Sequence, residues 1–313
     1  MPSLVAGLLK IFSRRTIKRD GLSHEQLVRH LRQHFNHTPV LPLLPRQVRC
    51  TQLETAAFVG ERISVAAPAM ALLYVHGGAY IAGVTRTYHA LAGRLAAELN
   101  AAVYLVRYPF APEHPFPQAV NRVVEGYRFL LDEGFAPENI VISGDSAGGG
   151  LSLATLLAVA DQALPQPRCA VLFSPGSNAL GDGESVDRND GSDAMLCADM
   201  IRKVTEIYVP DASQRSHRYA SPGLADFQGL PPLLITVASD EVLYSDAVAV
   251  RQQAEKAGIE VEWIERDGLF HVWPIMLPFL PEARDEIKRV LAFIRRHQPE
   301  SASAAQPDTL AKA

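Results

Sequence analysis

The chain contains little cysteine. Its 313 residues include only three, at Cys50, Cys169 and Cys197, far apart in the sequence. Their spacing matches neither a metal-binding nor a redox motif, so we expect free thiols and no bound metal. Unpaired thiols are typical of a reducing compartment, which predicts a cytoplasmic protein. His30 and His34 lie one helical turn apart, but no third ligand is evident nearby, so we expect both to face solvent.

The chain also lacks a strong charge imbalance and any long apolar run. Its formal net charge is −4 and its isoelectric point is about 6.2. Charges so close to balance give no reason to expect nucleic acid as a partner. No apolar run approaches the roughly 18–20 residues that a membrane-spanning helix requires.

The N-terminal residues are apolar, yet they do not follow the order of a secretory signal. Leu4–Phe12 is apolar apart from Lys10, and basic residues follow it at Arg14, Arg15, Lys18 and Arg19. A secretory signal carries its positive charges before its apolar stretch, so we interpret this segment as mature protein. A basic amphipathic helix could rest weakly on a membrane surface. We favour the alternative that the helix packs on the body of the protein.

Short apolar segments of strand length alternate along the chain with longer segments of helix length. This alternation predicts an α/β fold with a mostly parallel central sheet and helices on both faces. An opening hairpin is expected from Gln47–Val59 and Arg62–Val65. The later strands are expected at Met70–Val75, Ala102–Val106, Ile140–Ser143, Ala170–Phe173, Leu233–Val237 and Ile259–Ile264, and helices at Tyr88–Leu99, Ala119–Leu131 and Glu282–Arg296.

The alternation breaks between Asn178 and Gln228, where a polar stretch precedes a predicted helix at Ala198–Tyr208. An insertion after a core strand is where a lid over a site would lie. A capping-box pattern at Ser23 predicts a second N-terminal helix through about Phe35. We therefore divide the chain into N-terminal helices that form part of a cap (1–45), a core in two parts (46–177 and 229–297), a cap insertion between them (178–228) and a flexible tail (298–313).

A lone serine stands at the tip of a strand–turn–helix segment. Residues 139–150 read N-I-V-I-S-G-D-S-A-G-G-G, in which apolar strand residues lead into the turn around Ser146. Gly144 and Gly148 remove side chains that would collide in so sharp a turn. The N–H groups that follow the serine begin a helix, whose partial positive charge favours an oxyanion. We interpret Asp145 as a residue that stabilises the turn.

Ser146 would need a base, because a serine hydroxyl is a poor nucleophile at neutral pH. His271 follows the last predicted strand and is the favoured base. The competing histidines are less suitable, since His114 lies in a proline-rich loop and His89 near a helix start.

The base would in turn need an acid that orients it. Asp240 follows the predicted strand Leu233–Val237 directly, at the carboxyl edge of the sheet where α/β sites form, and is our prediction. Glu241 and Asp246 are the alternatives. We expect Glu241 to point another way because it neighbours Asp240, and Asp246 to serve at the start of the next helix.

A negatively charged oxygen at this site would have to be met by fixed donors. The N–H of Ala147 is one candidate. The others lie in His76-Gly77-Gly78-Ala79, at the end of the strand Met70–Val75, where glycines let backbone amides approach a substrate closely.

Taken together, these motifs resemble the hormone-sensitive-lipase-like (family IV) esterases of the α/β-hydrolase fold. The resemblance extends from about Met70 to His271 and includes the chain order serine, acid, histidine. The segments that carry it are His76-Gly77-Gly78-Ala79-Tyr80, Ala111–Pro117, Gly144–Gly149, Ser239–Leu243 and Phe270-His271.

The resemblance implies an α/β-hydrolase with a helical cap, and a carboxylic ester hydrolase that needs no cofactor and prefers short to medium acyl chains. It assigns Ser146 as nucleophile, His271 as general base and then acid, and Asp240 as the orienting carboxylate. It places the oxyanion hole at Gly77, Gly78, Ala79 and Ala147, with Gly77 shaping the turn. Tyr80 and His76 are candidates for contact with the substrate, and a structural role for Tyr80 is equally open.

Two departures from the family pattern stand out. The family usually has glycine where this chain has Ala79, which keeps its N–H and remains a donor unless the position needs a positive φ. The segment Arg107-Tyr108-Pro109-Phe110 replaces the more common Asp-Tyr-Arg-Leu.

Three functions remain open at this stage. The favoured one is a serine esterase whose partner is a small ester. The same residues could serve a lactone hydrolase, an amidase or an acyltransferase, since the pocket selects the leaving group and the acceptor. The third is a catalytically silent protein that binds small molecules. The oligomeric state is also open, with a homodimer as one alternative.

Overall fold

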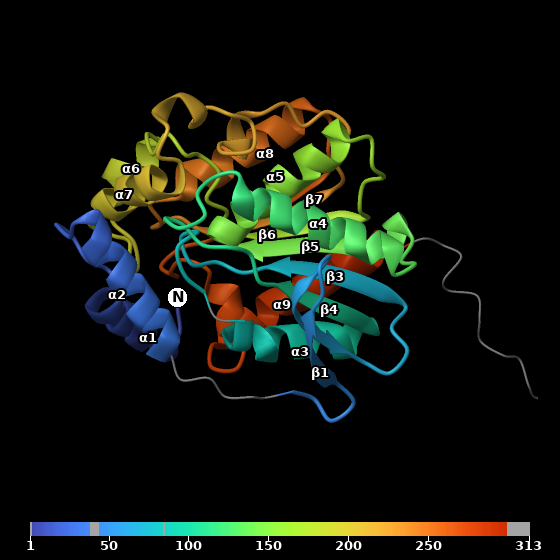
Figure 1. The fold of residues 1–313 in the computed structure, drawn as a ribbon. Helices are drawn as coiled ribbons and strands as arrows, with labels where there is room; N and C mark the ends of the chain where they lie inside the picture. Colours follow the sequence, from blue (N-terminus) through green and yellow to red (C-terminus); the bar gives the residue numbers. More distant parts are fainter. Residues whose placement is uncertain (1, 38–43, 84, 299–313) are drawn as a thin grey trace, which may run out of the picture.

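An eight-stranded sheet runs through the middle of the molecule (Figure 1). The computed structural model describes residues 2–37, 44–83 and 85–298. The strand order is β1-β2-β4-β3-β5-β6-β7-β8, in which β1 pairs antiparallel with β2, β2 antiparallel with β4, and all other neighbours are parallel. The strands are β1 (Arg49–Glu54), β2 (Val59–Ser64), β3 (Met70–Val75), β4 (Ala101–Val106), β5 (Ile140–Asp145), β6 (Cys169–Phe173), β7 (Leu233–Ala238) and β8 (Val261–Arg266).

Helices cover both faces of this sheet, as the alternating pattern predicted. One face packs against α3 (His89–Leu99) and α9 (Pro281–Arg296), and the other against α4 (Gln118–Asp132), α5 (Ala147–Asp161) and α8 (Tyr244–Lys256) (Figure 1). Every residue of β3, β4 and β5 is buried, because these central strands are covered on both sides. The sequences of β3 and β4 are accordingly continuous apolar runs rather than alternating ones, as is the first half of β5.

The remaining helices gather at one end of the molecule (Figure 1). They are α1 (Leu4–Thr16), α2 (His24–His37), α6 (Glu184–Arg188) and α7 (Ala198–Tyr208). The capping box predicted at Ser23 is present, since the amide of Gln26 donates to the Ser23 hydroxyl and the Gln26 side chain accepts from the Ser23 amide. We call these four helices the cap. Short 3-10 helices lie at Thr85–Tyr88, Pro137–Asn139, Ala212–Gln214, Pro222–Leu224 and Trp273–Met276.

Most predicted elements begin and end within two residues of their observed bounds. The largest difference lies in the opening hairpin, where we expected the first strand to continue to Val59 and β1 instead ends at Glu54. The predicted flexible tail lies outside the described residues except at Gln298.

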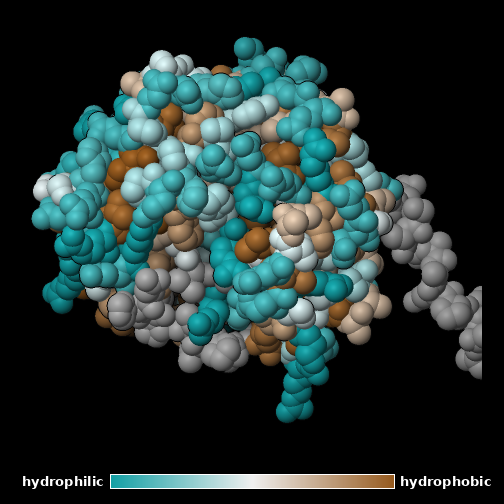
Figure 2. All heavy atoms as spheres, in the orientation of Figure 1, coloured by the Kyte–Doolittle hydropathy of each residue, from teal (hydrophilic) through white to brown (hydrophobic). Residues whose placement is uncertain are grey.

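Among the described residues, no helix is both long and apolar enough to cross a membrane. The face in Figure 2 is mostly hydrophilic, with hydrophobic residues in small patches between.

Two glycines inside helices predict opposite responses to alanine. A Cβ on Gly126 would lie 3.5 Å from Leu73 and from Phe58, an ordinary contact, whereas a Cβ on Gly148 would collide with the backbone carbonyl of Val75. Gly126→Ala should therefore stabilise the protein by about 0.5–1 kcal/mol through helix propensity. Gly148→Ala should destabilise it by about 1–3 kcal/mol or more, because backbone must move. Urea unfolding measures both, and a Gly148→Ala protein as stable as the wild type would contradict the close approach of α5 to β3.

Candidate active site

Ser146 occupies the turn between β5 and α5 in a strained conformation. Its φ is 54° and its ψ is −124°, a region that costs a non-glycine residue on the order of 1–3 kcal/mol. The turn is held from three sides, since the Ser146 amide donates to the Phe173 carbonyl and its own carbonyl accepts from Gly149 and Gly176, each at 2.9 Å. A Cβ on Gly144 would collide with the Gly148 carbonyl, so the predicted need for two glycines is confirmed.

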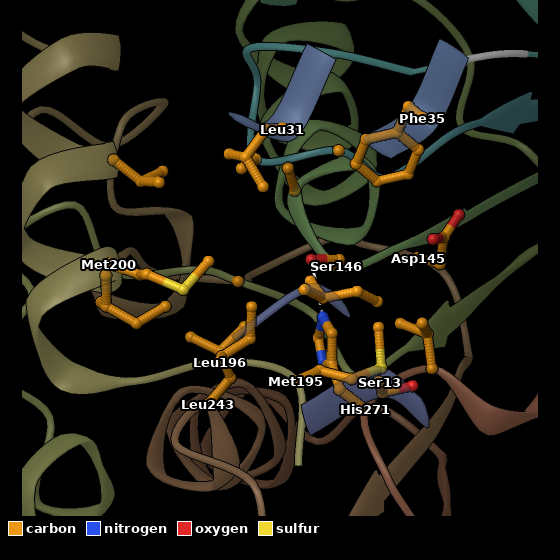
Figure 3. Close-up of a pocket in the computed structure, with 18 of the residues that line it drawn as sticks. Ser13, Leu31, Phe35, Asp145, Ser146, Met195, Leu196, Met200, Leu243 and His271 are labelled. Carbon is orange, nitrogen blue, oxygen red and sulfur yellow. Dashed lines mark hydrogen bonds between the residues drawn. The ribbon is translucent and has the colours of Figure 1, made fainter. Parts of the chain in front are cut away.

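His271 lies beside this serine, as predicted. Its Nε2 is 2.8 Å from the Ser146 Oγ, and the two side chains point toward each other in Figure 3. His271 comes from the loop after β8, and its side chain is buried. In the neutral ring with its single N–H proton on Nδ1, Nε2 accepts a hydrogen bond from the serine hydroxyl.

The acid that contacts His271 is Glu241, and our prediction of Asp240 is wrong. The Glu241 Oε2 is 2.6 Å from His271 Nδ1, so the ring donates to this carboxylate. Asp240 instead points toward α1, where it forms an ion pair with Lys10 at 3.2 Å, and its side chain is 35% exposed. The carboxylate next to His271 is therefore one residue later in the chain than we expected.

The shape of the turn after β7 explains the difference. The Glu241 side chain folds back over the strand end, where its Oε1 accepts from the Ala238 amide at 2.7 Å and from the Ser174 hydroxyl at 2.8 Å. The same Ser174 hydroxyl accepts from the amide of Val272, next to the histidine. With the His271 contact, the buried Glu241 carboxylate has three donors, and the strand ends of β6 and β7 fix its position.

The cap insertion also holds this turn. Asn189 donates from its side chain to the carbonyls of Ser239 and Glu241, at 2.9 and 2.8 Å. Asp193 accepts from the Val242 amide at 2.9 Å and is itself buried. The pKa of Asp193 is raised, because the effect of burial exceeds the opposing effect of the nearby His271. The sequence offered no signal for either residue, because both lie in the polar stretch of the insertion.

The surroundings of His271 favour its protonated form. Burial alone lowers the pKa of an imidazole, but the charge and hydrogen bond of Glu241 outweigh burial, and Asp193 and Asp145 add to them. The net effect is a pKa raised above the usual 6.5. A histidine in this setting accepts a proton more readily than a solvated one.

Asp145 holds the glycine-rich loop after β3, whereas we had interpreted it as stabilising its own turn. Its two carboxylate oxygens accept from Tyr74, from Tyr88 and from the Gly77 amide, at 3.0–3.1 Å. Burial raises the pKa of Asp145 to about 6, against the opposing effect of these hydrogen bonds. The Gly77 amide also donates to Tyr88, so it is already used inside the protein. Gly77 therefore shapes the loop and is not itself a free donor.

Gly78, Ala79 and Ala147 line the cavity around Ser146. No acceptor is found among the described residues for the N–H groups of Gly78 and Ala79, and Ala147 is the first residue of α5, where no partner exists within the helix. Ala79 has a φ of 57°, so this position does adopt the positive φ that would suit glycine. The alanine keeps its N–H but holds a left-handed conformation at a cost of roughly 1–2 kcal/mol.

His76 does not line the cavity, so the prediction of its contact with substrate is wrong. Its buried ring stacks on Tyr108, with centroids 4.4 Å apart, and packs edge-on against Phe110. Its Nδ1 donates to the Gly77 carbonyl at 2.7 Å, and burial lowers its pKa to about 4. The ring is thus a neutral support beneath the loop, and the unusual Arg107–Phe110 segment supplies the aromatic residues around it.

The serine opens into a cavity of about 360 Å³ that lies under the cap. Tyr80 lines it and also supports it, since its ring stacks on Tyr208 at 3.8 Å and its hydroxyl donates to the Gly176 carbonyl. The cap side chains labelled in Figure 3 are mostly apolar. The cavity-lining residues from the cap and from its connections are Leu9, Phe12, Ser13, Thr16, Ile17, Leu31, His34, Phe35, Asn178, Ala179, Met195, Leu196, Met200, Ile201, Val204, Thr205 and Tyr208.

Two further titratable groups reach this cavity. Asp246 accepts from the amides of Ser177 and Asn178 at 2.7 and 3.0 Å, at the point where the cap insertion begins, and burial raises its pKa to about 7. Asp246 thus lies in the first turn of α8, where we expected it, but its carboxylate holds the start of the cap insertion. We predicted that His34 faces solvent, but it lines the cavity instead. Burial lowers its pKa.

The described residues include one group with metal-ligand chemistry. Cys50, Glu61 and His89 bring one ligand atom each to within 4.8 Å of one another. His89 is already hydrogen-bonded to Glu61 at 2.6 Å. The group lies on β1, β2 and the start of α3, outside the cavity lining, so it contributes nothing to the chemistry at Ser146.

Comparison with known proteins places this chain among proteins of one fold. A family model described as the alpha/beta hydrolase fold matches residues 72–275. An acetyl-hydrolase of Streptomyces hygroscopicus is 41% identical over 72% of this chain and 75% of its own length. An esterase of Acinetobacter venetianus is 33% identical over 79% of this chain and 82% of its own.

Solved structures cover nearly the whole chain. EstE5, in crystals soaked with p-nitrophenyl butyrate, has a TM-score of 0.86 at 34% identity and covers 95% of this chain and 99% of its own. An esterase from the bacterial hormone-sensitive lipase family has a TM-score of 0.82 at 31% identity, with 94% and 97% covered. The chain belongs to the hormone-sensitive-lipase-like (family IV) esterases of the alpha/beta hydrolase fold.

Proposed function

We propose that this esterase is a serine carboxylesterase that acts through an acyl-enzyme on Ser146. The observation that carries the proposal is the unbroken hydrogen-bonded chain from the Ser146 hydroxyl through His271 to Glu241, which opens into an apolar cavity. Such a chain activates an otherwise weak alcohol nucleophile, because the base accepts the proton and the carboxylate orients the base.

In the first half of the reaction, the Ser146 Oγ attacks the ester carbonyl carbon while its proton passes to His271 Nε2. The carbonyl oxygen becomes an oxyanion, which the N–H groups of Gly78, Ala79 and Ala147 would stabilise. His271 then gives its proton to the departing alkoxide, so that an alcohol leaves and an acyl group stays on Ser146. Glu241 remains ionised and stabilises the imidazolium throughout.

In the second half, His271 removes a proton from a water molecule as that water attacks the acyl carbon. The tetrahedral intermediate collapses, the carboxylic acid is released, and the proton returns to the Ser146 oxygen. No redox step and no external group are required, so we propose that the reaction needs no cofactor.

We further propose that the acyl groups are short to medium in length. An apolar cavity of about 360 Å³ fits an acyl chain of a few carbons together with a small alcohol. Two similar proteins fit this range, since one is named an acetyl-hydrolase and the other was soaked with a butyrate ester.

We also propose the cytoplasm as the compartment, because Cys50, Cys169 and Cys197 are unpaired.

A series of p-nitrophenyl esters from acetate to palmitate tests the proposed reaction. We expect kcat/KM to peak among the short to medium chains and Ser146→Ala to abolish turnover. Activity that survives in Ser146→Ala would show that another group is the nucleophile. Absence of turnover with every ester in a folded protein would redirect the proposal toward a lactone or an amide.

Alanine substitution at the two adjacent acidic residues separates their roles. Glu241→Ala should lower kcat by at least about a hundredfold, because His271 loses its orienting partner. Asp240→Ala should change kcat less than about fivefold, because the partly exposed pair with Lys10 is worth at most about 1 kcal/mol. Steady-state kinetics on a soluble ester measure kcat for the two variants, and thermal unfolding confirms that both fold. The reverse order of effects would return the catalytic role to Asp240.

The pH dependence tests the influence of the cap on His271. The base must be neutral to accept the serine proton, so kcat/KM should fall as pH falls through the raised pKa of His271, with its midpoint above 6.5. The negative charges of Glu241, Asp193 and Asp145 all raise the pKa of His271. Asp193→Asn removes one of these three charges, so the midpoint should move to lower pH. Asp240→Asn is the matched control and should leave the midpoint in place. An unchanged or higher midpoint in Asp193→Asn would contradict the account.

A further inference from the structure

Helix α1 exposes a stripe of large apolar side chains to solvent. The exposed fractions are 90% for Leu4, 68% for Leu8, 56% for Phe12, 53% for Ile11 and 36% for Val5. Their spacing of three, four and seven residues places them on one side of the helix. We call these five residues the α1 stripe.

The stripe is not needed to attach the helix. The opposite side of α1 is buried through Ala6 and Ser13. The helix is anchored at its start by Ser3, whose amide and hydroxyl donate to Glu282, and in its middle by Lys10, which pairs with Asp240. Near its end, Arg14 donates to three carbonyls of the cap insertion between residues 191 and 193. A rigidly held helix thus presents apolar side chains that nothing in the described part of the chain covers.

The charge of this segment is of one sign. Residues 2–19 contain five basic side chains and no acidic one, and of the five Lys10 is paired with Asp240. Arg15 is exposed and lies seven residues after Leu8 and four after Ile11, on the same side of the helix. An apolar stripe flanked by cations matches the chemistry of an anionic lipid surface, in which apolar side chains enter the acyl boundary and basic ones meet the headgroups.

The stripe is continuous with the cavity that holds Ser146. Phe12 belongs to both, being more than half exposed and also a lining residue. Leu9, Ser13 and Thr16 continue the cavity lining along the adjacent side of α1. An ester dissolved in a lipid surface beneath α1 would therefore meet an apolar path toward the serine.

We propose that the α1 stripe docks the protein on anionic lipid surfaces and that esters held in such a surface enter the cavity beside Phe12. The delivery of esters rests on the proposed esterase function, whereas the docking does not. The helix lies in the plane of the interface, and one such contact without a lipid anchor gives reversible binding.

Vesicle binding tests the docking without reference to catalysis. The full-length chain carrying Ser146→Ala, which cannot consume the lipid, is sedimented with large vesicles of phosphatidylcholine alone or mixed with phosphatidylglycerol. We expect binding to the mixed vesicles, with at least tenfold weaker binding to the neutral ones and a marked loss in high salt. The double substitution Leu8→Ser with Ile11→Ser should reduce binding at least tenfold.

A matched control separates the α1 stripe from general surface apolarity. Leu224 is a 49% exposed leucine outside α1, so Leu224→Ser should leave vesicle binding unchanged. Without Ser146→Ala, the Leu8→Ser, Ile11→Ser protein should hydrolyse soluble p-nitrophenyl butyrate at the wild-type rate, because neither residue lines the cavity. The same protein should lose activity on an ester embedded in anionic vesicles.

Three results would overturn the docking. The first is no sedimentation with anionic vesicles, and the second is equal sedimentation of the stripe variant. The third is a wild-type dimer in analytical ultracentrifugation that the stripe variant converts to a monomer without any vesicle binding, which would assign the stripe to a second copy of the chain. Vesicle binding with no hydrolysis of any ester would leave docking intact and overturn the proposed function instead.

Discussion

The buried contact between Glu241 and His271 is the interaction on which the rest of the site depends. An imidazole so enclosed would lose its base strength to desolvation unless a carboxylate compensated for it. Here Glu241 compensates, and its own carboxylate is fixed by Ser174 and the Ala238 amide. The ends of β6 and β7 fix this side chain, and the cap insertion holds the backbone of the turn that carries it, so both contribute to where the ring of His271 lies.

A second buried carboxylate, that of Asp145, directly precedes Ser146 in the chain and has a different task. Its oxygens face two tyrosine hydroxyls and the Gly77 amide, so its hydrogen bonds point away from the reacting atoms. It fixes the loop that presents the amides of Gly78 and Ala79. One carboxylate thus contacts the proposed base, and the other holds the loop that carries two of the proposed oxyanion donors.

The sequence predicted the sheet, the flanking helices, Ser146 and His271, because each depends on local patterns: apolar runs of strand length, a glycine-rich turn, and a histidine after the last strand. It did not separate Asp240 from Glu241, since the choice depends on how the turn after β7 folds back and on a hydrogen bond to Ser174, far away in the sequence. The same limit applies to His76, which the aromatic residues Tyr108 and Phe110 enclose, and to the contacts of Asn189 and Asp193. In each case the partner comes from a distant element, and no local pattern encodes it.

We propose that the pair of His271 and Glu241 makes Ser146 the most nucleophilic hydroxyl in this chain. Covalent labelling tests it most directly: the full chain is incubated with phenylmethylsulfonyl fluoride, and the adduct is located by intact mass and peptide mapping. We predict a single sulfonyl adduct per wild-type chain, on the peptide that contains Ser146. The His271→Ala variant should carry no adduct after the same incubation time. An adduct on a different residue, or equally fast labelling of Ser146 without the histidine, would contradict the account.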